Sequence, residues 1–371
     1  MKSDLESLLA LYDPSKPLEE ASTIPGPWYT DPRIYEAERP TVFGASWQFV
    51  ARLDQLQKQG QYVTAEIAGE HIVVVRDMGG LKAFYNVCRH HATLVMCQPE
   101  GECSTMRCPY HGWTYGLDGK LKGAPDMGGG DFDKSKIGLL PVRVEAWENY
   151  VFVCLEPAAP SLAEFLGDLP RQVKALDVGR FKFFERRVYE FKCNWKVYVD
   201  NYLDGGYHVP VLHKSLATVI DYVNYTVENK DRFCLQKAPL KASASNADSS
   251  RLRRGEHAYY YWLYPNFMLN WYEGVMDTNL VLPMGHDRTK VVFDFYFDDV
   301  SPAAHERNKA SVDLGERIQH EDQDISVSVQ KGLSSRSYTA GRLSVRREAG
   351  EHLFHRLVAA DLAKTLESAK A

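Results

Sequence analysis

The residues with the clearest chemical meaning are Cys88, His90, Cys108 and His111. They form two pairs, each with one cysteine and one histidine, and seventeen residues separate His90 from Cys108. Two thiolates on one iron and two neutral imidazoles on the other describe a Rieske [2Fe–2S] centre, whose imidazole ligands raise its reduction potential. The spacing therefore predicts that these four residues hold a Rieske cluster and that the protein carries electrons.

A Cys2His2 zinc site is the main alternative for this motif. Zinc fingers usually group both cysteines in one half and both histidines in the other, whereas here each half has one of each. His91 is the nearest rival ligand, but His90 has the matching spacing, so we expect His91 to lie at the surface or to form hydrogen bonds. A zinc protein would be colourless, whereas a Rieske centre absorbs visible light.

A one-electron carrier needs an acceptor, and a second group of residues suggests one. His208 and His213 lie five positions apart and follow the carboxylates of Asp200 and Asp204. Two imidazoles and one carboxylate on one face of Fe(II) leave coordination positions open for O2. Pro210 should break the helix between the histidines, so a bend must bring His213 back towards His208. We therefore predict a mononuclear iron, although two histidines at this spacing are weak evidence without the cluster motif upstream.

The third iron ligand must come from another part of the chain. The segment 319–333 offers three acids, Glu321, Asp322 and Asp324, within one expected long helix. Their residue types and spacing do not separate the three, since acids on a helix are often simply solvated charges.

The elements that must position these motifs fall into two groups, which gives an α+β fold class. Strand signals separated by turn residues are dense over 41–157, which predicts an all-β domain that carries both Cys–His loops. A helical link then opens a domain of strands and helices over 158–371, and the proline-rich residues 1–40 read as an arm. Expected strands and helices of the second domain are Phe183–Phe191, Trp195–Tyr202, Tyr259–Trp271, Thr278–Pro283, Val291–Phe297, Ala303–Leu333 and His352–Ala369.

The composition excludes several classes of protein. The chain has 371 residues, of which 44% are hydrophobic and 25% charged, as in ordinary globular proteins. The net charge of −5 comes without a basic stripe, so no nucleic-acid partner is expected. No apolar run reaches the roughly 18 residues of a membrane-spanning helix, and the acidic start lacks the features of a signal peptide. Seven cysteines without secretory cues predict reduced thiols and a cytoplasmic protein.

Longer strings resemble one family, the catalytic α subunits of Rieske non-haem iron oxygenases. They include Asn86-Val-Cys-Arg-His-His-Ala and Cys108-Pro-Tyr-His-Gly-Trp-Thr-Tyr, without the extra loop cysteines of respiratory Rieske proteins. The run from Asn194 to Pro210 and the run Tyr264-Pro-Asn-Phe-Met-Leu-Asn-Trp-Tyr look like choline monooxygenase and related quaternary-amine monooxygenases. The resemblance covers nearly the whole chain from about residue 40.

The resemblance implies a Rieske domain followed by a helix-grip catalytic domain, in which an antiparallel sheet wraps around a helix and the iron. It selects Asp322 as the third iron ligand and implies a ring-shaped homotrimer. In this family a carboxylate near the first ligand histidine bridges the two metal sites of adjacent subunits. That acid often lies three residues before the histidine, which is Gly205 here, so Asp204 is the expected bridge and Asp200 the runner-up.

The implied reaction uses O2 and electrons from NAD(P)H, delivered by a separate flavin- and iron–sulfur-containing reductase. The expected substrate is a quaternary ammonium compound, most simply choline, which would be converted to betaine aldehyde through its hydrate. The alternatives with the same cofactors are an N- or O-demethylase acting on glycine betaine, carnitine or a related betaine, and an aromatic-ring hydroxylase. From another class, the chain could be an electron-transfer ferredoxin with an inert second domain.

Substrate contacts are expected on an aromatic run, because a quaternary ammonium cannot donate a hydrogen bond and binds to aromatic faces. If 259–272 forms one strand, alternation places every second residue on the same face. Aromatic strands are usually core, so single assignments from this pattern are weak. The candidates are Tyr202, Tyr264, Asn270 and Tyr272.

Overall fold

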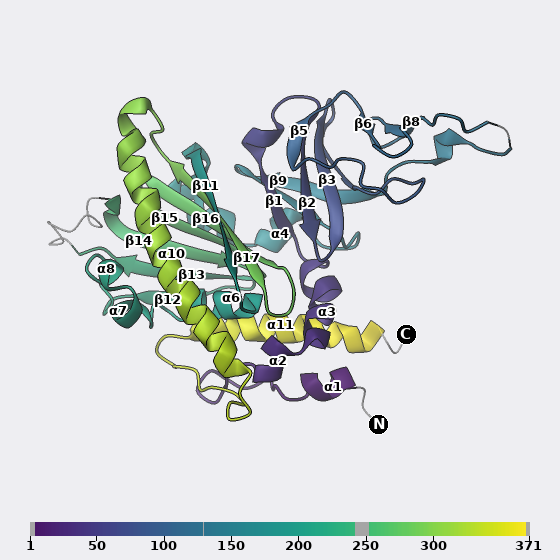
Figure 1. Cartoon of the computed structure of the whole chain (residues 1–371). Helices are drawn as coiled ribbons and strands as arrows, with labels where there is room; N and C mark the ends of the chain where they lie inside the picture. Colours follow the sequence, from purple (N-terminus) through teal and green to yellow (C-terminus); the bar gives the residue numbers. More distant parts are fainter. Residues whose placement is uncertain (1–3, 129, 242–251, 369–371) are drawn as a thin grey trace. The chain divides into compact units, whose positions relative to one another are not determined.

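The computed structural model describes residues 4–128, 130–241 and 252–368. Contacts between residues divide the chain into two compact units, Arg39–Phe165 and a second unit of Met1–Glu38 with Leu166–Ala371. The first is an all-β unit and the second combines one sheet with helices, which confirms the expected α+β class. Figure 1 shows the elements of each unit.

Seven antiparallel strands form the main sheet of the first unit. One of its inner strands contains the β-branched run Ile72–Val75, which is buried on both faces and favours an extended chain. The sheet order is β1 (Gln48–Arg52), β10 (Tyr150–Cys154), β9 (Pro141–Trp147), β4 (Gly80–Tyr85), β3 (Glu70–Asp77), β2 (Gln61–Ile67) and β5 (Glu100–Glu102).

A small three-stranded sheet in the same unit holds the second Cys–His loop. Strand β6 (Met106–Arg107) ends directly before Cys108, and β7 (Thr114–Tyr115) begins just after the loop and pairs with β8 (Leu121–Gly123). The first loop follows β4. Cys88 and Cys108 belong to one buried apolar cluster, so both loops are anchored on the same small core. The short helical turns of this unit are η1 (Arg39–Phe43), η2 (Leu53–Leu56), η3 (Lys134–Lys136) and α4 (Leu162–Leu166).

The second unit contains a separate seven-stranded antiparallel sheet. Its order is β11 (Lys182–Phe191), β17 (Thr289–Phe297), β16 (Val275–Pro283), β15 (Phe267–Glu273), β14 (Arg254–Leu263), β13 (Phe233–Pro239) and β12 (Thr226–Asn229). The long helix α10 (His305–Leu333) crosses one face of this sheet (Figure 1).

Helix α6 (Trp195–Leu203) lies between the sheet and the long helices, because it contacts β16, α10 and α11 (Ala349–Ser368). It buries residues all round, including Trp195, Val199 and Leu203 at helical spacing. The shorter helical segments of the unit are α5 (Leu169–Val173), η4 (Lys174–Leu176), η5 (Val178–Arg180), α7 (Val209–Leu212), α8 (Lys214–Ala217) and η6 (Pro302–Ala304).

The aromatic run does not form the single strand expected from sequence. It is a hairpin of β14 and β15, and Tyr264-Pro265-Asn266 forms the connection between the two strands. Tyr260 pairs with Asn270 across this hairpin, so even-numbered residues of both strands still share a face. The prediction of one strand over Tyr259–Trp271 was wrong because the proline cannot donate to the sheet and the chain reverses there.

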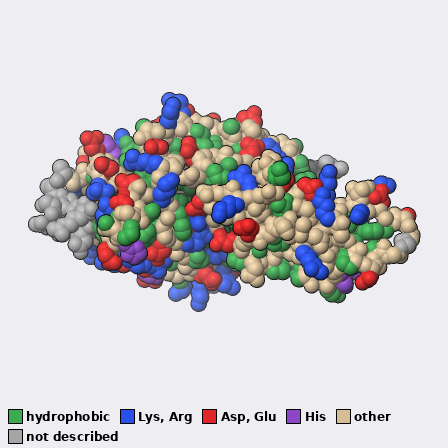
Figure 2. Space-filling model, turned by 90° about the horizontal axis from the view of Figure 1, so that it is seen from above, with side chains coloured by type: hydrophobic (Ala, Val, Ile, Leu, Met, Phe, Trp, Pro, Cys, Tyr) green, Lys and Arg blue, Asp and Glu red, His purple; other side chains and the backbone are tan. Residues whose placement is uncertain are grey.

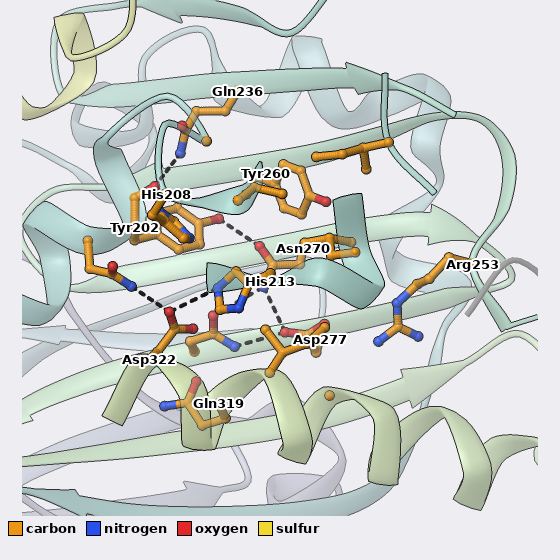
Figure 3. Close-up of a pocket in the computed structure, with 18 of the residues that line it drawn as sticks. Tyr202, His208, His213, Gln236, Arg253, Tyr260, Asn270, Asp277, Gln319 and Asp322 are labelled. Carbon is orange, nitrogen blue, oxygen red and sulfur yellow. Dashed lines mark hydrogen bonds and ion pairs between the residues drawn. The ribbon is translucent and has the colours of Figure 1, made fainter. Parts of the chain in front are cut away.

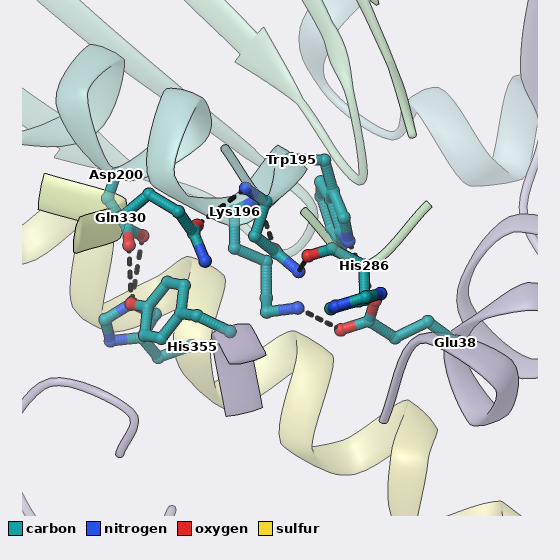
Figure 4. A network of polar contacts seen from close by, with 9 residues as sticks. Glu38, Trp195, Lys196, Asp200, His286, Gln330 and His355 are labelled. Atoms are coloured by element: carbon teal, nitrogen blue, oxygen red, sulfur yellow. Dashed lines mark hydrogen bonds and ion pairs between the residues drawn. The ribbon is translucent and has the colours of Figure 1, made fainter. Parts of the chain in front are cut away.

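Residues 4–38 pack within the second unit through α1 (Asp4–Leu9), α2 (Gly26–Thr30) and α3 (Pro32–Glu38). Glu38 anchors this segment, because its carboxylate accepts from Lys196 Nζ at 2.5 Å and from Trp195 Nε1 at 2.8 Å (Figure 4). Both Glu38 and Lys196 are fully buried. The arm is therefore tied to the helix that precedes His208 and His213.

On the face drawn in Figure 2, acidic and basic side chains of the described residues are interspersed rather than gathered by sign. Among the described helices, none combines the length and the apolar character that crossing a bilayer requires.

Candidate metal centres and substrate pocket

The two Cys–His loops of the first unit have the same backbone hydrogen bonds. In each, the cysteine N–H donates to the carbonyl five residues later, and the residue four positions on donates back to the cysteine carbonyl. That fourth residue has a positive φ in both loops, 59° at Ala92 and 72° at Gly112. Two matching turns therefore present Cys88 with His90 and Cys108 with His111.

The donor set of these loops fits a Rieske cluster. Both cysteines are 3% exposed, and the His90 and His111 rings lie 4.7 Å apart. His90 stacks on Trp113 at 4.7 Å, and its Nδ1 atom is buried without a hydrogen-bond partner among the described residues. The pKa of His90 is lowered by burial and then by the neighbouring imidazoles of His91 and His111. A lower pKa favours the neutral imidazole, which is the form that binds a metal. An iron ion would satisfy the orphaned nitrogen.

His91 lies beside this loop pair rather than in the ligand pattern. Its ring is 4.1 Å from His90 and 5.4 Å from His111. Tyr115 supports the cysteine side, since its hydroxyl lies 3.3 Å from Cys88 Sγ and accepts from the Arg89 N–H at 3.0 Å.

In the second unit, the structure brings together His208, His213 and Asp322. Their ligand atoms all lie within 4.8 Å of one another, and the two imidazole rings are nearly perpendicular at 4.8 Å. His213 Nε2 lies 3.0 Å from Asp322 Oδ1. Two imidazoles and one carboxylate on one side of a pocket are the donor set of a non-haem Fe(II) centre.

Two further carboxylates orient the histidines. Asp204 Oδ2 lies 2.6 Å from His208 Nδ1, and Glu321 Oε2 lies 2.6 Å from His213 Nδ1. Each contact occupies Nδ1 and leaves Nε2 for a metal, as is usual for metal-binding histidines. Burial lowers the pKa of His213, but Asp322 and Glu321 raise it more strongly, so its pKa is above the usual value. The same negative charge would stabilise a bound cation.

The three acids that were candidates for the third iron ligand differ in what they contact. Asp322 is buried in the triad and accepts from Asn201 Nδ2 at 2.8 Å. Glu321 supports His213 from behind, and Asp324 is exposed. Glu321, a candidate third ligand from sequence, therefore supports a histidine instead. Asn201 acts at this site only through a tertiary contact, so sequence patterns did not identify it.

Pro210 does not break the helix that carries the histidines, as the sequence had suggested. It lies in the first turn of the separate short helix α7, where proline is tolerated, and His208 and His213 flank that helix. The chain turns earlier, at Gly205 and Gly206, whose φ angles are 68° and 69°. A Cβ at Gly205 would also collide with the Arg347 carbonyl at 2.2 Å. The glycine pair, not the proline, therefore ends the run from α6.

The two acids considered for a bridging role lie in different surroundings. Asp204 caps the end of α6 and accepts from the backbone N–H groups of Tyr207 and His208 at 3.0 Å each. Asp200, one turn earlier, accepts from Tyr29 Oη at 2.6 Å and lies 3.0 Å from His355 Nε2 (Figure 4). Only Asp204 contacts an iron-ligand histidine.

The triad opens into a pocket within the second unit, with a volume of about 870 Å³ that includes its opening to solvent. A chain of hydrogen bonds runs along its wall: Tyr202 Oη donates to Asn270 Oδ1 at 2.7 Å, and Asn270 Nδ2 donates to Asp277 Oδ1 at 2.8 Å (Figure 3). Its aromatic lining comes from Tyr198, Tyr202, Tyr225, Tyr260, Tyr272, Phe293 and Phe295.

Three of the four substrate candidates, Tyr202, Asn270 and Tyr272, line this pocket. Tyr264 does not, and that expectation is corrected: it lies in the hairpin connection, and its hydroxyl donates to Asp361 Oδ2 at 2.6 Å. The lining also includes Tyr260, whose hydroxyl lies 2.6 Å from that of Tyr272. If Tyr264-Pro265-Asn266 is taken as a turn, Tyr260 falls opposite Asn270 in the hairpin, so the sequence contained a signal for Tyr260.

Two charged residues of the pocket were missed, Asp277 and Arg253. Burial raises the pKa of Asp277, while Arg253 and the side chains of Asn270 and Asn279 lower it, and the net change is upward. Neither residue belongs to a motif, so the sequence offered no signal for them.

Comparison with known proteins agrees with both centres. Residues 46–144 match the Rieske [2Fe-2S] domain, and residues 178–364 match the ring hydroxylating alpha subunit (catalytic domain). The chain is 38% identical to chloroplastic choline monooxygenase of Arabidopsis thaliana, over 96% of this chain and 86% of the relative. It is 33% identical to the carnitine monooxygenase oxygenase subunit of Escherichia coli (strain K12), over 92% and 94% respectively.

Solved structures show the same likeness. The quaternary ammonium Rieske monooxygenase CntA, in complex with an inhibitor, superposes with a TM-score of 0.85 at 27% identity, over 97% of this chain and 99% of that one. Naphthalene 1,2-dioxygenase with bound indole gives a TM-score of 0.78 at 19% identity, over 95% of each chain, which indicates a shared fold.

Proposed function

Because this chain belongs to the Rieske oxygenases with a ring-hydroxylating type of catalytic α subunit, we propose that it is the oxygenase component of a monooxygenase for a quaternary ammonium compound. The family assignment makes the Rieske cluster and a mononuclear iron its cofactors. The observation that carries the proposal is the triad of His208, His213 and Asp322 at the wall of an aromatic pocket.

The bound iron would supply O2 activation, so that a substrate C–H bond becomes C–OH and the second oxygen atom leaves as water, with consumption of two electrons and two protons. The residues of the chain prepare this reaction. Asp204 and Glu321 hold the Nδ1 atoms of the two histidines, and Asn201 fixes Asp322. The pocket wall orients the substrate and limits the access of water.

Several features of the pocket support a quaternary ammonium substrate. Such a cation is bound by aromatic faces and by negative charge, since it has no hydrogen to donate. Tyr202, Tyr260 and Tyr272 supply the faces, and Asp277 supplies a buried carboxylate. The relatives named choline monooxygenase and carnitine monooxygenase point to the same class of substrate.

Choline is the substrate favoured by the resemblance of the sequence and by the similarity to choline monooxygenase. Hydroxylation of its carbinol carbon gives a geminal diol that loses water to form betaine aldehyde. A carboxylated quaternary amine is the second candidate, supported by the carnitine monooxygenase relative and by the presence of Arg253 in the pocket. Hydroxylation of an N-methyl group would then release formaldehyde.

We also propose the partners that the reaction requires. A separate flavin and iron–sulfur reductase would pass electrons from NAD(P)H to the cluster. A homotrimer would place the cluster of one subunit near the iron of the next, with Asp204 between His111 of one subunit and His208 of the other. The hydrogen bond between Asp204 and His208 supports Asp204 over Asp200 in this role. Cytoplasmic location stays a prediction, because the plant relatives are named chloroplastic.

The test is turnover of the iron-loaded protein with a generic reductase, NADH and O2 against choline, glycine betaine and carnitine, with products identified by mass. We expect at least one quaternary amine to be oxidised, and His208→Ala to abolish product while the visible spectrum of the cluster persists. Cluster reduction without any product would favour an electron carrier instead. Oxidation of aromatic compounds alone would favour the ring-hydroxylase alternative.

A further inference from the structure

Arg253 is a buried cation in the wall of the substrate pocket. It directly precedes β14, it is 6% exposed, and it lines the same cavity as the iron ligands. Its Nη1 donates to Ser311 Oγ on helix α10 at 2.5 Å, and its guanidinium carbon lies 4.9 Å from the centre of the Tyr272 ring. These contacts hold the side chain against the pocket wall (Figure 3).

Among the described residues, no carboxylate lies at ion-pair distance from this guanidinium, although Arg253 is near enough to Asp277 to lower the pKa of that carboxyl. A guanidinium stays protonated in proteins and presents five donors, so its burial is costly unless an anion faces it. Within the described ranges of the chain, no carboxylate forms an ion pair with Arg253. The pocket carboxylate Asp277 instead accepts from Asn270 Nδ2 and Asn279 Nδ2, both at 2.8 Å. Ser311 and the Tyr272 hydroxyl take up donors of Arg253, and a guanidinium with five donors keeps others for a ligand.

The charged side chains of the pocket follow one another in space along its wall. In Figure 3, Asp322 and His213 lie towards one end, Arg253 lies at the other, and Asp277 lies between them. Away from the iron ligands, the pocket thus offers one carboxyl group, Asp277, and one guanidinium, Arg253. A zwitterion, with a cationic group near Asp277 and an anionic group at Arg253, matches this pattern, whereas a simple cation brings no anionic group to Arg253.

We propose that Arg253 binds the carboxylate of the substrate, and that the enzyme prefers quaternary ammonium carboxylates to choline. This inference rests on the proposed function and narrows its substrate class. A guanidinium can bind a carboxylate through two parallel charge-assisted hydrogen bonds, whereas the alcohol of choline offers a single neutral acceptor. Anchoring the carboxylate at the Arg253 end directs the ammonium and its methyl groups towards the tyrosines and the iron ligands.

The first test compares substrates on the wild-type enzyme. Choline and glycine betaine share the trimethylammonium group and differ in an alcohol or a carboxylate, and 4-(trimethylammonio)butanoate adds a longer spacer. We expect kcat/KM for the better carboxylate to exceed that for choline by at least about tenfold, as one charged hydrogen bond allows. A higher kcat/KM for choline than for both carboxylates overturns the proposal and leaves the proposed function intact.

The second test changes the guanidinium. We expect Arg253→Gln to lower the ratio of kcat/KM for the carboxylate to that for choline by about tenfold to a hundredfold, with most of the effect in KM. Arg253→Lys should keep part of the ratio, because it keeps the charge but loses the planar fork. Arg254→Gln, an exposed neighbour, is the matched control and should leave the ratio unchanged. An unchanged ratio in Arg253→Gln contradicts the inference.

A binding measurement separates this inference from the proposed function. Saturating 4-(trimethylammonio)butanoate should raise the thermal midpoint of the iron-loaded wild type more than choline does, and Arg253→Lys should reduce that difference. If no quaternary amine is oxidised but this difference appears, the proposed reaction fails and the carboxylate site stands. Equal shifts with both ligands contradict the site, and the wild-type comparison decides even where a variant does not fold.

Discussion

Asn201 gives the most direct test of how the iron ligands are held. Its Nδ2 donates to Asp322 Oδ1 at 2.8 Å, and the same oxygen lies 3.0 Å from His213 Nε2. Leucine has nearly the shape of asparagine but no donor. Asn201→Leu therefore removes one hydrogen bond to a buried carboxylate and leaves the three iron ligands unchanged.

The expected magnitude follows from that single bond. A hydrogen bond to a charged group contributes about 1.5–3 kcal/mol, which corresponds to roughly a tenfold to a hundredfold change in an equilibrium constant. Loss of groups that orient metal ligands usually weakens metal binding over a similar range, about 10- to 100-fold. We expect the Fe(II) dissociation constant of Asn201→Leu to rise by this factor.

The assay is anaerobic competition for Fe(II) against a chromophoric chelator, with the visible absorbance of the Rieske cluster as an internal check of folding. Asn224→Leu is the matched control, because Asn224 donates to Asp221 Oδ2 at 2.7 Å on the exposed surface. Its Fe(II) affinity should equal that of the wild type. If Asn201→Leu binds Fe(II) as tightly as Asn224→Leu, Asn201 does not support the ligand set and the reasoning is refuted.

Three further predictions concern other carboxylates. Asp204→Asn should keep both metals but slow electron transfer from cluster to iron at least tenfold in single-turnover experiments, and an unchanged rate would remove Asp204 from the path. Glu38→Gln should lower the free energy of unfolding by about 3–5 kcal/mol in denaturant titrations, because it leaves Lys196 buried without a counter-charge. The control Asp168→Asn, at an ion pair on the surface, should cost much less, and equal losses would contradict the buried pair. The pKa of Glu351 lies well above its usual 4.5, because of burial first and then the charges of Asp200, Glu348 and Asp204. The folded protein therefore binds this proton more tightly than the unfolded chain, and wild-type stability should fall as pH rises from about 4.5 through the raised pKa. Glu351→Gln should flatten this part of the thermal midpoint against pH, and parallel profiles would disprove the assignment.

Local sequence patterns described the cluster loops well because their chemistry is local. Cys88 with His90 and Cys108 with His111 each lie on one turn, and a turn needs only a few adjacent residues. The α+β division and the family assignment were confirmed for a similar reason, since strand and helix signals repeat over long stretches.

The errors had two sources, local turn signals that were overlooked and side chains that are placed by tertiary contacts. The hairpin at Tyr264-Pro265-Asn266 was hidden inside an aromatic run, although alternation kept Asn270 and Tyr272 on the pocket face. Pro210 was given the role of the glycine pair before it, because the length of α6 depends on its packing. Arg253 belongs to no recognisable motif, and only its position in the wall of the pocket indicates a function.

The central claim is that this chain uses O2 to oxidise a quaternary ammonium compound at an iron held by His208, His213 and Asp322. The direct measurement is the product formed per O2 consumed by the reductase-coupled enzyme, with choline and its carboxylated analogues as substrates. We predict close to one product per O2 for at least one of them, and none with His208→Ala. Reduction and reoxidation of the cluster without product from any quaternary amine would contradict the central claim.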